Sequence, residues 1–345
     1  MIRIWRKDLP IMMINNEIAI DLGTANILVY NKDKGLVYNE PSFVAIDKKS
    51  KKIIAIGHEA KAMLGRTNKD IETFRPMIDG VISDYKYVLP MVKRILKRNK
   101  FPFNARKVTI SVPYGVSDIE MRSVVEMAEE LGFHKIEIVD EPVVAALGEG
   151  IDINEAKGNL IVDIGAGTTD IAVITLGSIA IGKSIKIASD DYDAAIIGLI
   201  RNQYNLEIGQ LTAEKVKMSF CRYYGDKELS TISVAGLNVV TGLPDSKVIK
   251  IEALTTKLTP VVEMIVDAVH SVLEATDPEL VSDILANGLI LTGGGSFNPL
   301  VKQMIADRTG LEVITSLAPL DSVGNGLMRK LNGYTIRQKP SVHNY

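Results

Sequence analysis

Residues 160–175, L-I-V-D-I-G-A-G-T-T-D-I-A-V-I-T, limit most strongly what this chain can fold into. An apolar run reaches Asp163, a glycine turn follows, and a second apolar run follows the turn, which predicts a β-hairpin. Gly165 and Gly167 leave backbone N–H groups open to an anion, and Thr168 adds a hydroxyl. Asp163 ends the first strand, where a carboxylate can hold a hydrated Mg²⁺ beside phosphates. Taken alone, the pattern is equally typical of an ordinary glycine turn between core strands.

A second stretch repeats this order near the start of the chain. Residues 18–30, I-A-I-D-L-G-T-A-N-I-L-V-Y, run from an apolar strand through Asp21 and a glycine turn into another strand. The two aspartates lie 142 residues apart (163 − 21). Similar hairpins at that distance predict two related halves that face each other across a cleft and share one polyphosphate. The predicted binding residues are Gly23, Thr24, Ala25 and Asn26 in the first tip and Gly165, Ala166, Gly167 and Thr168 in the second.

A third glycine run supports a nucleotide ligand. Residues 289–292 have the pattern of a buried strand, and Gly293, Gly294 and Gly295 follow directly. Asn298 and Pro299 then have the pattern of an N-cap and first position of a helix. A glycine loop that leads into a helix N-terminus can accept phosphate or a flat ring close to its backbone. Such a loop is weak evidence alone, but after two aspartate hairpins it indicates a nucleotide site.

The wording of these motifs resembles the actin and heat-shock-chaperone ATPase superfamily and, within it, the MreB family of bacterial actins. The matching runs are D-L-G-T-A-N, N-E-P-S, G-H-E-A-K-x-M-L-G-R-T, R-P-M-x-D-G-V-I-x-D, D-E-P-x-x-A-A-L-G, D-I-G-x-G-T-T-D-I-A-V, N-L-x-I-G-x-x-T-A-E, V-T-G-L-P and L-T-G-G-G. They extend from Asp21 to Gly295, and similarity continues through Gly326. One departure is Ser189, which stands where the family usually has glycine and leaves the local nucleotide geometry open.

The resemblance implies an α/β, actin-like ATPase fold. Two similar halves would each hold a sheet flanked by helices and a smaller outer subdomain, with the nucleotide in the cleft between them. The implied subdomains are IA at residues 15–33, 75–146 and 320–345; IB at 34–74; IIA at 147–184 and 247–319; and IIB at 185–246.

The same resemblance implies the ligands and their contacts. ATP or ADP would bind with Mg²⁺, and the metal would be held by Asp21 and Asp163 largely through water. Glu214 and Lys217 would approach the ribose and base, although surface pairing on a helix also explains them. The implied catalytic residues are Glu141, Asp163 and Thr168.

Glu141 also has an interpretation from the residues alone. It follows a strand-like run and precedes Pro142, so its carboxylate can orient or deprotonate a water that attacks the γ-phosphate. It can equally be an acidic residue in the first turn of a helix, favoured by the helix dipole. The two roles are compatible.

Composition narrows the class of protein. The chain has 345 residues, of which 46% are hydrophobic, enough for a large core. A net charge of −2 offers no global attraction for nucleic acid. The single cysteine, Cys221, excludes an internal disulfide and fits a cytoplasmic location. No apolar run reaches the ~18 residues that a membrane-spanning helix needs.

Two segments suggest contact with an anionic membrane surface. Residues 1–14 interleave apolar residues, including Trp5, with three cations, but this also fits a frayed terminus. Residues 93–107 hold seven cations and no acids around Phe101 and Phe103. The resemblance places a hydrophobic membrane loop here, so these two rings are predicted to insert into lipid within a basic collar. The alternative is a solvated basic helix with both rings in the core.

The resemblance gives a functional expectation that the fold alone does not, because this superfamily hosts several functions. It implies a slow ATPase whose hydrolysis is coupled to polymerisation into paired protofilaments at the inner face of the cell membrane. Those filaments would control cell shape, either by guiding wall synthesis or by supporting helicity and motility in wall-less cells such as spiroplasmas. The partners would be other copies of the chain, the membrane, and shape or motility machinery. The alternatives are a sugar or acetate kinase of the same superfamily and a filament protein of the ParM or FtsA type.

Overall fold

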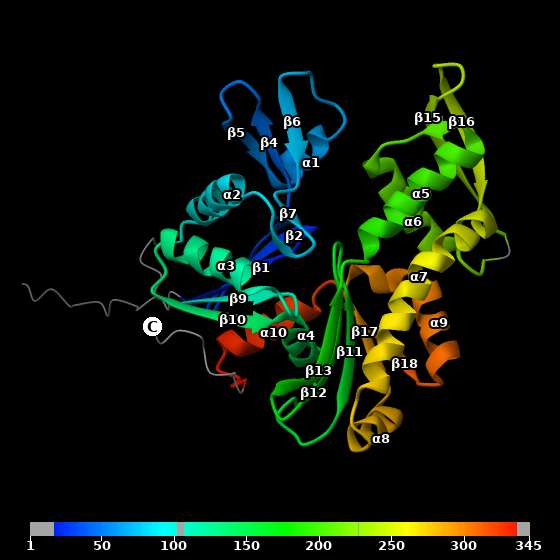
Figure 1. Ribbon diagram of the computed structural model, residues 1–345. Coiled ribbons are helices and arrows are strands. Elements are labelled where there is room, and N and C mark those ends of the chain that lie inside the picture. The colour runs from blue at the N-terminus through cyan, green and yellow to red at the C-terminus, as the bar shows by residue number, and fades with distance from the viewer. Residues whose placement is uncertain (1–16, 102–106, 227, 337–345) are drawn as a thin grey trace, which may run out of the picture.

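The two predicted hairpins lie in two large sheets that have the same topology (Figure 1). The computed structural model describes residues 17–101, 107–226 and 228–336. In each sheet an antiparallel three-stranded meander carries two further strands that run parallel to its first strand. The prediction of two related halves is confirmed by this match.

The first large sheet has the strand order β10-β9-β1-β2-β3 and the second has the order β13-β12-β11-β17-β18. The strands of the first are β1 (Glu17–Leu22), β2 (Asn26–Asn31), β3 (Gly35–Pro41), β9 (Lys107–Val112) and β10 (Lys135–Asp140). Those of the second are β11 (Asn159–Ile164), β12 (Thr169–Thr175), β13 (Ser178–Ile185), β17 (Leu289–Thr292) and β18 (Val313–Thr315).

Helices cover both faces of each large sheet, which is why the central strands consist almost entirely of apolar residues. The outer faces pack on α2 (Tyr85–Arg98) and α3 (Asp118–Glu130) in the first half, and on α7 (Ile251–Glu274), α8 (Pro278–Asn287) and α9 (Pro299–Thr309) in the second. Between the sheets lies a shared layer formed by α4 (Glu141–Gly148) and α10 (Ser322–Leu331). This layer packs on Ala19 and Leu28 of the first sheet and on Ile161 and Ala172 of the second.

Each half carries an outer subdomain with its own small sheet, and the two outer parts stand opposite each other at the top of Figure 1. The first contains β4 (Val44–Asp47), β5 (Ile53–Ile56), α1 (Gly57–Met63) and β6 (Ile71–Phe74), and a short hairpin of β7 (Met77–Ile78) and β8 (Val81–Ile82) leads back from it. The second contains α5 (Ser189–Tyr204), β14 (Leu206–Glu207), α6 (Gln210–Tyr223), β15 (Thr231–Asn238) and β16 (Pro244–Lys250).

The first outer subdomain begins later than we predicted from the sequence. We assigned it residues 34–74, but β3 (Gly35–Pro41) pairs along its length with β2 and is the edge strand of the large sheet. The cause is the short turn after β2, which returns the chain directly along its neighbour as a meander. The separate small sheet starts at β4.

Phe101 is buried, so the prediction that it inserts into lipid is wrong. The residue is 9% exposed and belongs to the core of the first half. The reason is the end of α2, where Lys100 adopts a left-handed φ of 54°. The Lys100 N–H then bonds to the Lys97 carbonyl (3.1 Å) and the Phe101 N–H to the Leu96 carbonyl (3.0 Å). This Schellman ending turns Phe101 back onto the helix that precedes it.

The other two predicted membrane residues, Trp5 and Phe103, lie outside the described residues. Over the part of the chain that is described, no helix combines the length and the apolar character that crossing a bilayer requires.

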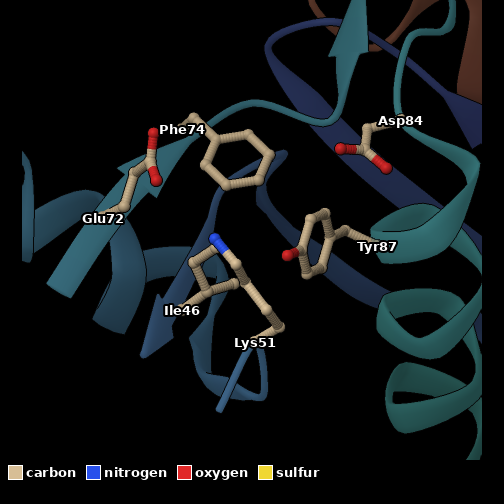
Figure 2. Close-up of a pocket in the computed structure, with 6 residues that line it drawn as sticks. All are labelled: Ile46, Lys51, Glu72, Phe74, Asp84 and Tyr87. Carbon is tan, nitrogen blue, oxygen red and sulfur yellow. The ribbon is translucent and has the colours of Figure 1, made fainter. Parts of the chain in front are cut away.

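A shallow pocket of about 300 Å³ lies between the small sheet of the first half and the start of α2 (Figure 2). An edge-to-face pair, Phe74 and Tyr87, forms one side, with ring centroids 5.4 Å apart. Lys51 points inward, and the carboxylates of Glu72 and Asp84 stand at the rim (Figure 2). Neither hairpin tip contributes to this pocket, so it is distinct from the candidate site.

Candidate functional site

The period-two alternation of the strands brings the two predicted aspartates together. In β1, Ile18, Ile20 and Leu22 face the outer helices, whereas Ala19 faces the shared α4–α10 layer. Asp21 is two residues beyond Ala19, and Asp163 in the same way is two residues beyond Ile161, which also faces that layer. Both carboxylates therefore stand on the facing sides of the two sheets, at the ends of the matching strands β1 and β11.

The two hairpin tips meet around a tight turn from the first half. Asp79 (φ 50°) and Gly80 (φ 71°) are both left-handed and join β7 to β8. The Thr24 Oγ1 accepts a hydrogen bond from the Gly80 N–H at 2.7 Å. On the other side, a Cβ on Gly167 would stand 2.8 Å from the Asp79 backbone, closer than real Cβ atoms come. Glycine at 167 is thus required for the tips to approach each other.

The third glycine run packs directly on the end of β11. Gly293 has a φ of 78°, and a Cβ there would stand 2.3 Å from Oδ1 of Asp163. A short 3₁₀ turn, η1 (Gly294–Phe297), follows, and then α9 begins. The Asn298 side chain accepts the Leu300 N–H at 3.1 Å and caps that helix, as predicted. The three predicted loops are therefore adjacent in space.

Buried carboxylates dominate the electrostatics between the loops. Burial raises the pKa of Asp163 to about 8, and the charges of Asp170 and Asp21 add to the rise. Burial also raises the pKa of Asp21 to about 6, against an opposing hydrogen bond from the Ser111 hydroxyl. None of the ion pairs among the described residues involves Asp21 or Asp163. Such a cluster gains from a bound cation.

The donor set fits Mg²⁺ held mainly through water. Within the described ranges, no three carboxylate, imidazole or thiolate groups converge to hold a metal directly. Mg²⁺ commonly binds one or two carboxylates, keeps several waters and takes its remaining ligands from substrate phosphates. Asp21 and Asp163 can provide those carboxylates.

The cluster predicts how stability depends on pH. The pKa of Asp163 is raised from 3.8 to about 8 in the folded chain, so the folded state binds the proton more tightly than the unfolded state does. The stability that protonated Asp163 contributes is therefore fully present below about pH 4. It is lost progressively as the pH rises toward 8. We expect the thermal midpoint of the nucleotide-free protein in a metal chelator to fall between pH 5 and 8. Asp163→Asn should flatten this slope, and an unchanged slope in that variant would contradict the assignment.

Glu141 begins α4 next to this cluster. It directly follows β10, so it lies where the α4–α10 layer meets the ends of the strands. Pro142 occupies the first turn of the helix, as predicted. Burial raises the pKa of Glu141, and the charges of Asp21, Asp170 and Asp163 raise it further. A raised pKa makes the ionised carboxylate a stronger base.

Asp170 is a site residue that we did not predict. It is the direct cross-strand partner of Asp163, and it is 1% exposed. Its Oδ1 accepts the backbone N–H of Tyr114 from the first half at 3.0 Å, which ties the second hairpin to the other half. The sequence pattern that could have predicted it is D-I-G-A-G-T-T-D. The register of a tight hairpin places the second aspartate of this run opposite the first.

Glu214 and Lys217, both on α6, have protein partners that the sequence did not indicate. Glu214 pairs with Lys61 of the other half at 2.9 Å. The Lys217 ammonium donates to Asp193 at 2.9 Å and to the Ser189 hydroxyl at 2.8 Å, so Ser189 helps to hold this lysine. Their predicted contacts with ribose and base stay predictions.

Comparisons with known proteins place this arrangement in a family. The MreB/Mbl protein family matches residues 15–339. The chain is 40% identical over 320 residues to the cell shape-determining protein Mbl of Bacillus subtilis, covering 92% of this chain and 96% of that one. It is 38% identical over 321 residues to the cell shape-determining protein MreB of Escherichia coli, covering 91% and 92%.

Solved structures agree with the fold. The crystal structure of MreB5 of Spiroplasma citri bound to AMPPNP superposes with a TM-score of 0.84 at 38% identity, covering 90% of this chain and 94% of that one. The same protein was also solved with ADP. A MamK double helical filament shares the fold with a TM-score of 0.77 at 21% identity, covering 92% and 100%. The predicted actin-like α/β fold is thus confirmed.

Proposed function

This chain belongs to the MreB/Mbl family of actin-like cytoskeletal proteins that control cell shape, and we propose that it polymerises with ATP and Mg²⁺ bound between its two halves. The observation that carries the proposal is the convergence of Asp21 and Asp163 from two matched hairpins, beside the glycine loop that packs on Asp163. The AMPPNP and ADP complexes of the Spiroplasma citri protein support a nucleotide as the ligand.

The tips supply the phosphate contacts in this proposal. Backbone N–H groups at Gly23 to Asn26 and at Ala166 to Thr168 would donate to phosphate oxygens from opposite sides, whereas the Gly165 N–H is already bonded to the Thr168 carbonyl at 2.9 Å. Mg²⁺, held through water by Asp21 and Asp163, would neutralise the charge that develops on the phosphates. Gly293, Gly294 and Gly295 would hold the base and sugar, and Glu214 and Lys217 would approach the ribose and base from α6.

Hydrolysis is assigned to Glu141 and Thr168. The Glu141 carboxylate orients the attacking water and accepts its proton, and the Thr168 hydroxyl helps to hold that water. Turnover is slow because the final geometry of the water is made when the halves close in the filament.

Self-association is the proposed use of the nucleotide. Closure of the two halves on ATP aligns the ends of the molecule for head-to-tail contact, which is heterologous and extends as a filament because it does not close into a ring. Two such protofilaments would pair, as the double helical filament of MamK illustrates for this fold. Sedimentation with and without nucleotide tests this proposal, because the protein should pellet as filaments only with ATP and Mg²⁺.

We place the filament in the cytoplasm, on the inner face of the membrane. The support is the basic face of α2, where Lys93, Lys97 and Arg98 are exposed opposite a buried apolar face. Anionic headgroups attract such a face, and the segment that follows it in the sequence contains Phe103.

Replacing Phe103 with serine is expected to weaken binding to anionic liposomes about ten- to hundredfold, since one inserted aromatic ring contributes roughly 1.5–3 kcal/mol. Co-sedimentation with liposomes measures this, while filament formation in solution should be unchanged. Phe101→Ser is the matched comparison: because the Phe101 ring is in the core, this change should lower the thermal midpoint. Equal liposome binding by Phe103→Ser would reject the loop and leave residues 1–14, with Trp5, as the membrane contact.

A further inference from the structure

One loop supports the start of the third glycine run, Gly293 to Gly295, from outside the hairpin tips. It joins β18 to α10 at residues 316–321, and we call it the β18–α10 loop. Its Pro319 carbonyl accepts the Gly293 N–H at 3.0 Å and lies 3.2 Å from the Thr292 hydroxyl. The position of this loop therefore affects where the glycine run begins.

Apolar packing holds little of the β18–α10 loop. Leu317 is fully exposed and Leu320 is 66% exposed, and of residues 316–321 only Pro319 is buried. A loop whose apolar side chains stay in water gains little from burial, so its geometry depends on hydrogen bonds.

Glu149 holds both ends of this loop. It lies at the C-terminal end of α4, and its Oε1 accepts the Ser316 hydroxyl at 2.8 Å and the Ser322 hydroxyl as well. Ser322 is the first residue of α10, so the carboxylate lies near the positive end of that helix dipole, which favours its ionised form. Among the ion pairs of the described residues none includes Glu149, so its charge is met by hydroxyl groups and a helix end.

The hydroxyl groups form a chain that has one direction. A hydroxyl carries a single proton, and Ser322 donates its proton to Glu149, so the Ser322 oxygen accepts from the Thr292 hydroxyl. Thr292 and Ser322 are 0% and 1% exposed, so water does not replace these bonds. Thr292 immediately precedes the glycine run and pairs in register with Asp163. The chain of hydrogen bonds therefore leads from Glu149 to the candidate site.

We propose that Glu149 is a positioning residue of the nucleotide site, which holds the glycine run through Ser322 and Thr292 in the shape that receives the base and sugar. This inference rests on the proposed nucleotide binding and adds a residue that touches neither nucleotide nor metal. Without the Glu149 carboxylate, both ends of the β18–α10 loop lose their anchor and two hydroxyl groups lose their acceptor. The glycine run must then be ordered when the nucleotide binds, which lowers affinity.

The test compares nucleotide affinity with the rate of hydrolysis in the full-length protein. Glu149→Ala should weaken the binding of ADP with Mg²⁺ about three- to tenfold, the size of one lost hydrogen bond, as measured by isothermal titration calorimetry. Phosphate release at saturating ATP should stay at the parent rate, because the hairpin tips and Glu141 are unchanged. Damage to the whole site would lower both.

Two further variants separate the hydrogen bonds from other effects of Glu149. Glu149→Gln keeps an oxygen that accepts both serine hydroxyls, so its ADP affinity should lie within roughly twofold of the parent. Ser322→Ala breaks the chain one step further on. The double variant Glu149→Ala/Ser322→Ala should bind ADP no more weakly than the weaker of the two single variants, because both remove the same connection.

A matched control lies on the same segment of the chain. Asp152 also accepts a hydroxyl, from Tyr334 at 2.7 Å, but Tyr334 follows the C-terminal end of α10 and the β18–α10 loop precedes its N-terminal end. Asp152→Ala should leave both ADP affinity and phosphate release unchanged.

The other outcomes decide against the proposal. If Glu149→Ala binds ADP as tightly as the parent, Glu149 has no positioning role. If Glu149→Gln loses as much affinity as Glu149→Ala, charge matters and the hydrogen bonds do not. Additive losses in the double variant reject the connection through Ser322, and slower phosphate release in Glu149→Ala at saturating ATP shows general damage to the site. A parent protein that binds no ADP at all would instead reject the proposed function itself.

Discussion

Replacing Glu141 with alanine is expected to leave ATP binding nearly unchanged and to reduce phosphate release about a hundredfold, the lower range for loss of a positioned general base. The carboxylate stands at the start of α4, beside the cluster of Asp21 and Asp163, and its raised pKa suits it to accept a proton. Phosphate release measured at saturating ATP reports the effect, and titration with a fluorescent ATP analogue reports binding.

Glu141→Gln separates two roles of this side chain. Glutamine keeps the size and a hydrogen-bonding oxygen but takes up no proton at neutral pH. If Glu141 acts as a base, glutamine should be as slow as alanine, whereas partial activity would mean that the residue mainly positions the water. Phosphate release by Glu141→Ala at the rate of the parent protein would remove Glu141 from the reaction.

Replacing Gly326 with alanine is expected to destabilise the protein by about 3 kcal/mol or more, at the upper end of what overpacking costs. Gly326 lies in α10, and a Cβ there would stand 1.7 Å from the Val144 carbonyl oxygen of α4. The crossing is close on both helices, because a Cβ on Gly148 would stand 1.9 Å from the Ser322 carbonyl oxygen. The backbone atoms at this crossing cannot move aside as a flexible side chain could. The two helices also form the layer on which both large sheets pack.

Urea denaturation of the nucleotide-free protein measures the loss, and Gly198→Ala is its control. Gly198 is also inside a helix, α5, but a Cβ there meets nothing within 4 Å. Alanine at 198 should therefore stabilise by about 0.5–1 kcal/mol through helix propensity alone. If the two variants had similar midpoints, the close crossing of α4 and α10 would be wrong.

Much of the site could be predicted from the sequence because its parts are local. A strand that ends in aspartate and a glycine turn fixes both the hairpin and the position of the carboxylate, and two copies predict two halves. Alternation then decides which face each aspartate takes, so Asp21 and Asp163 meet once both sheets share one helical layer. The cap at Asn298 and the start of α4 at Glu141 followed from short motifs in the same way.

The missed features depend on contacts that no local pattern encodes. Phe101 was predicted to insert into lipid because aromatic and basic residues coincide there and the resemblance places a membrane loop at this point. A left-handed Lys100 instead turns it into the core, and lysine seldom occupies that position. The partner of Glu214 is 153 residues away and depends on how the two halves sit together. The start of the outer subdomain was misplaced because the pairing of β3 with β2 depends on the short turn between them.

If nucleotide drives this chain into filaments, high-speed sedimentation should show it. The protein is spun with ATP and Mg²⁺, and in parallel without nucleotide in a chelator, and the pellets are viewed by negative-stain electron microscopy. We expect the protein to pellet with ATP and Mg²⁺ as paired filaments and to stay in the supernatant without them. A monomer that remains in the supernatant under every condition would contradict such assembly, and ATP-dependent phosphorylation of sugars or acetate would then be the activity to assay.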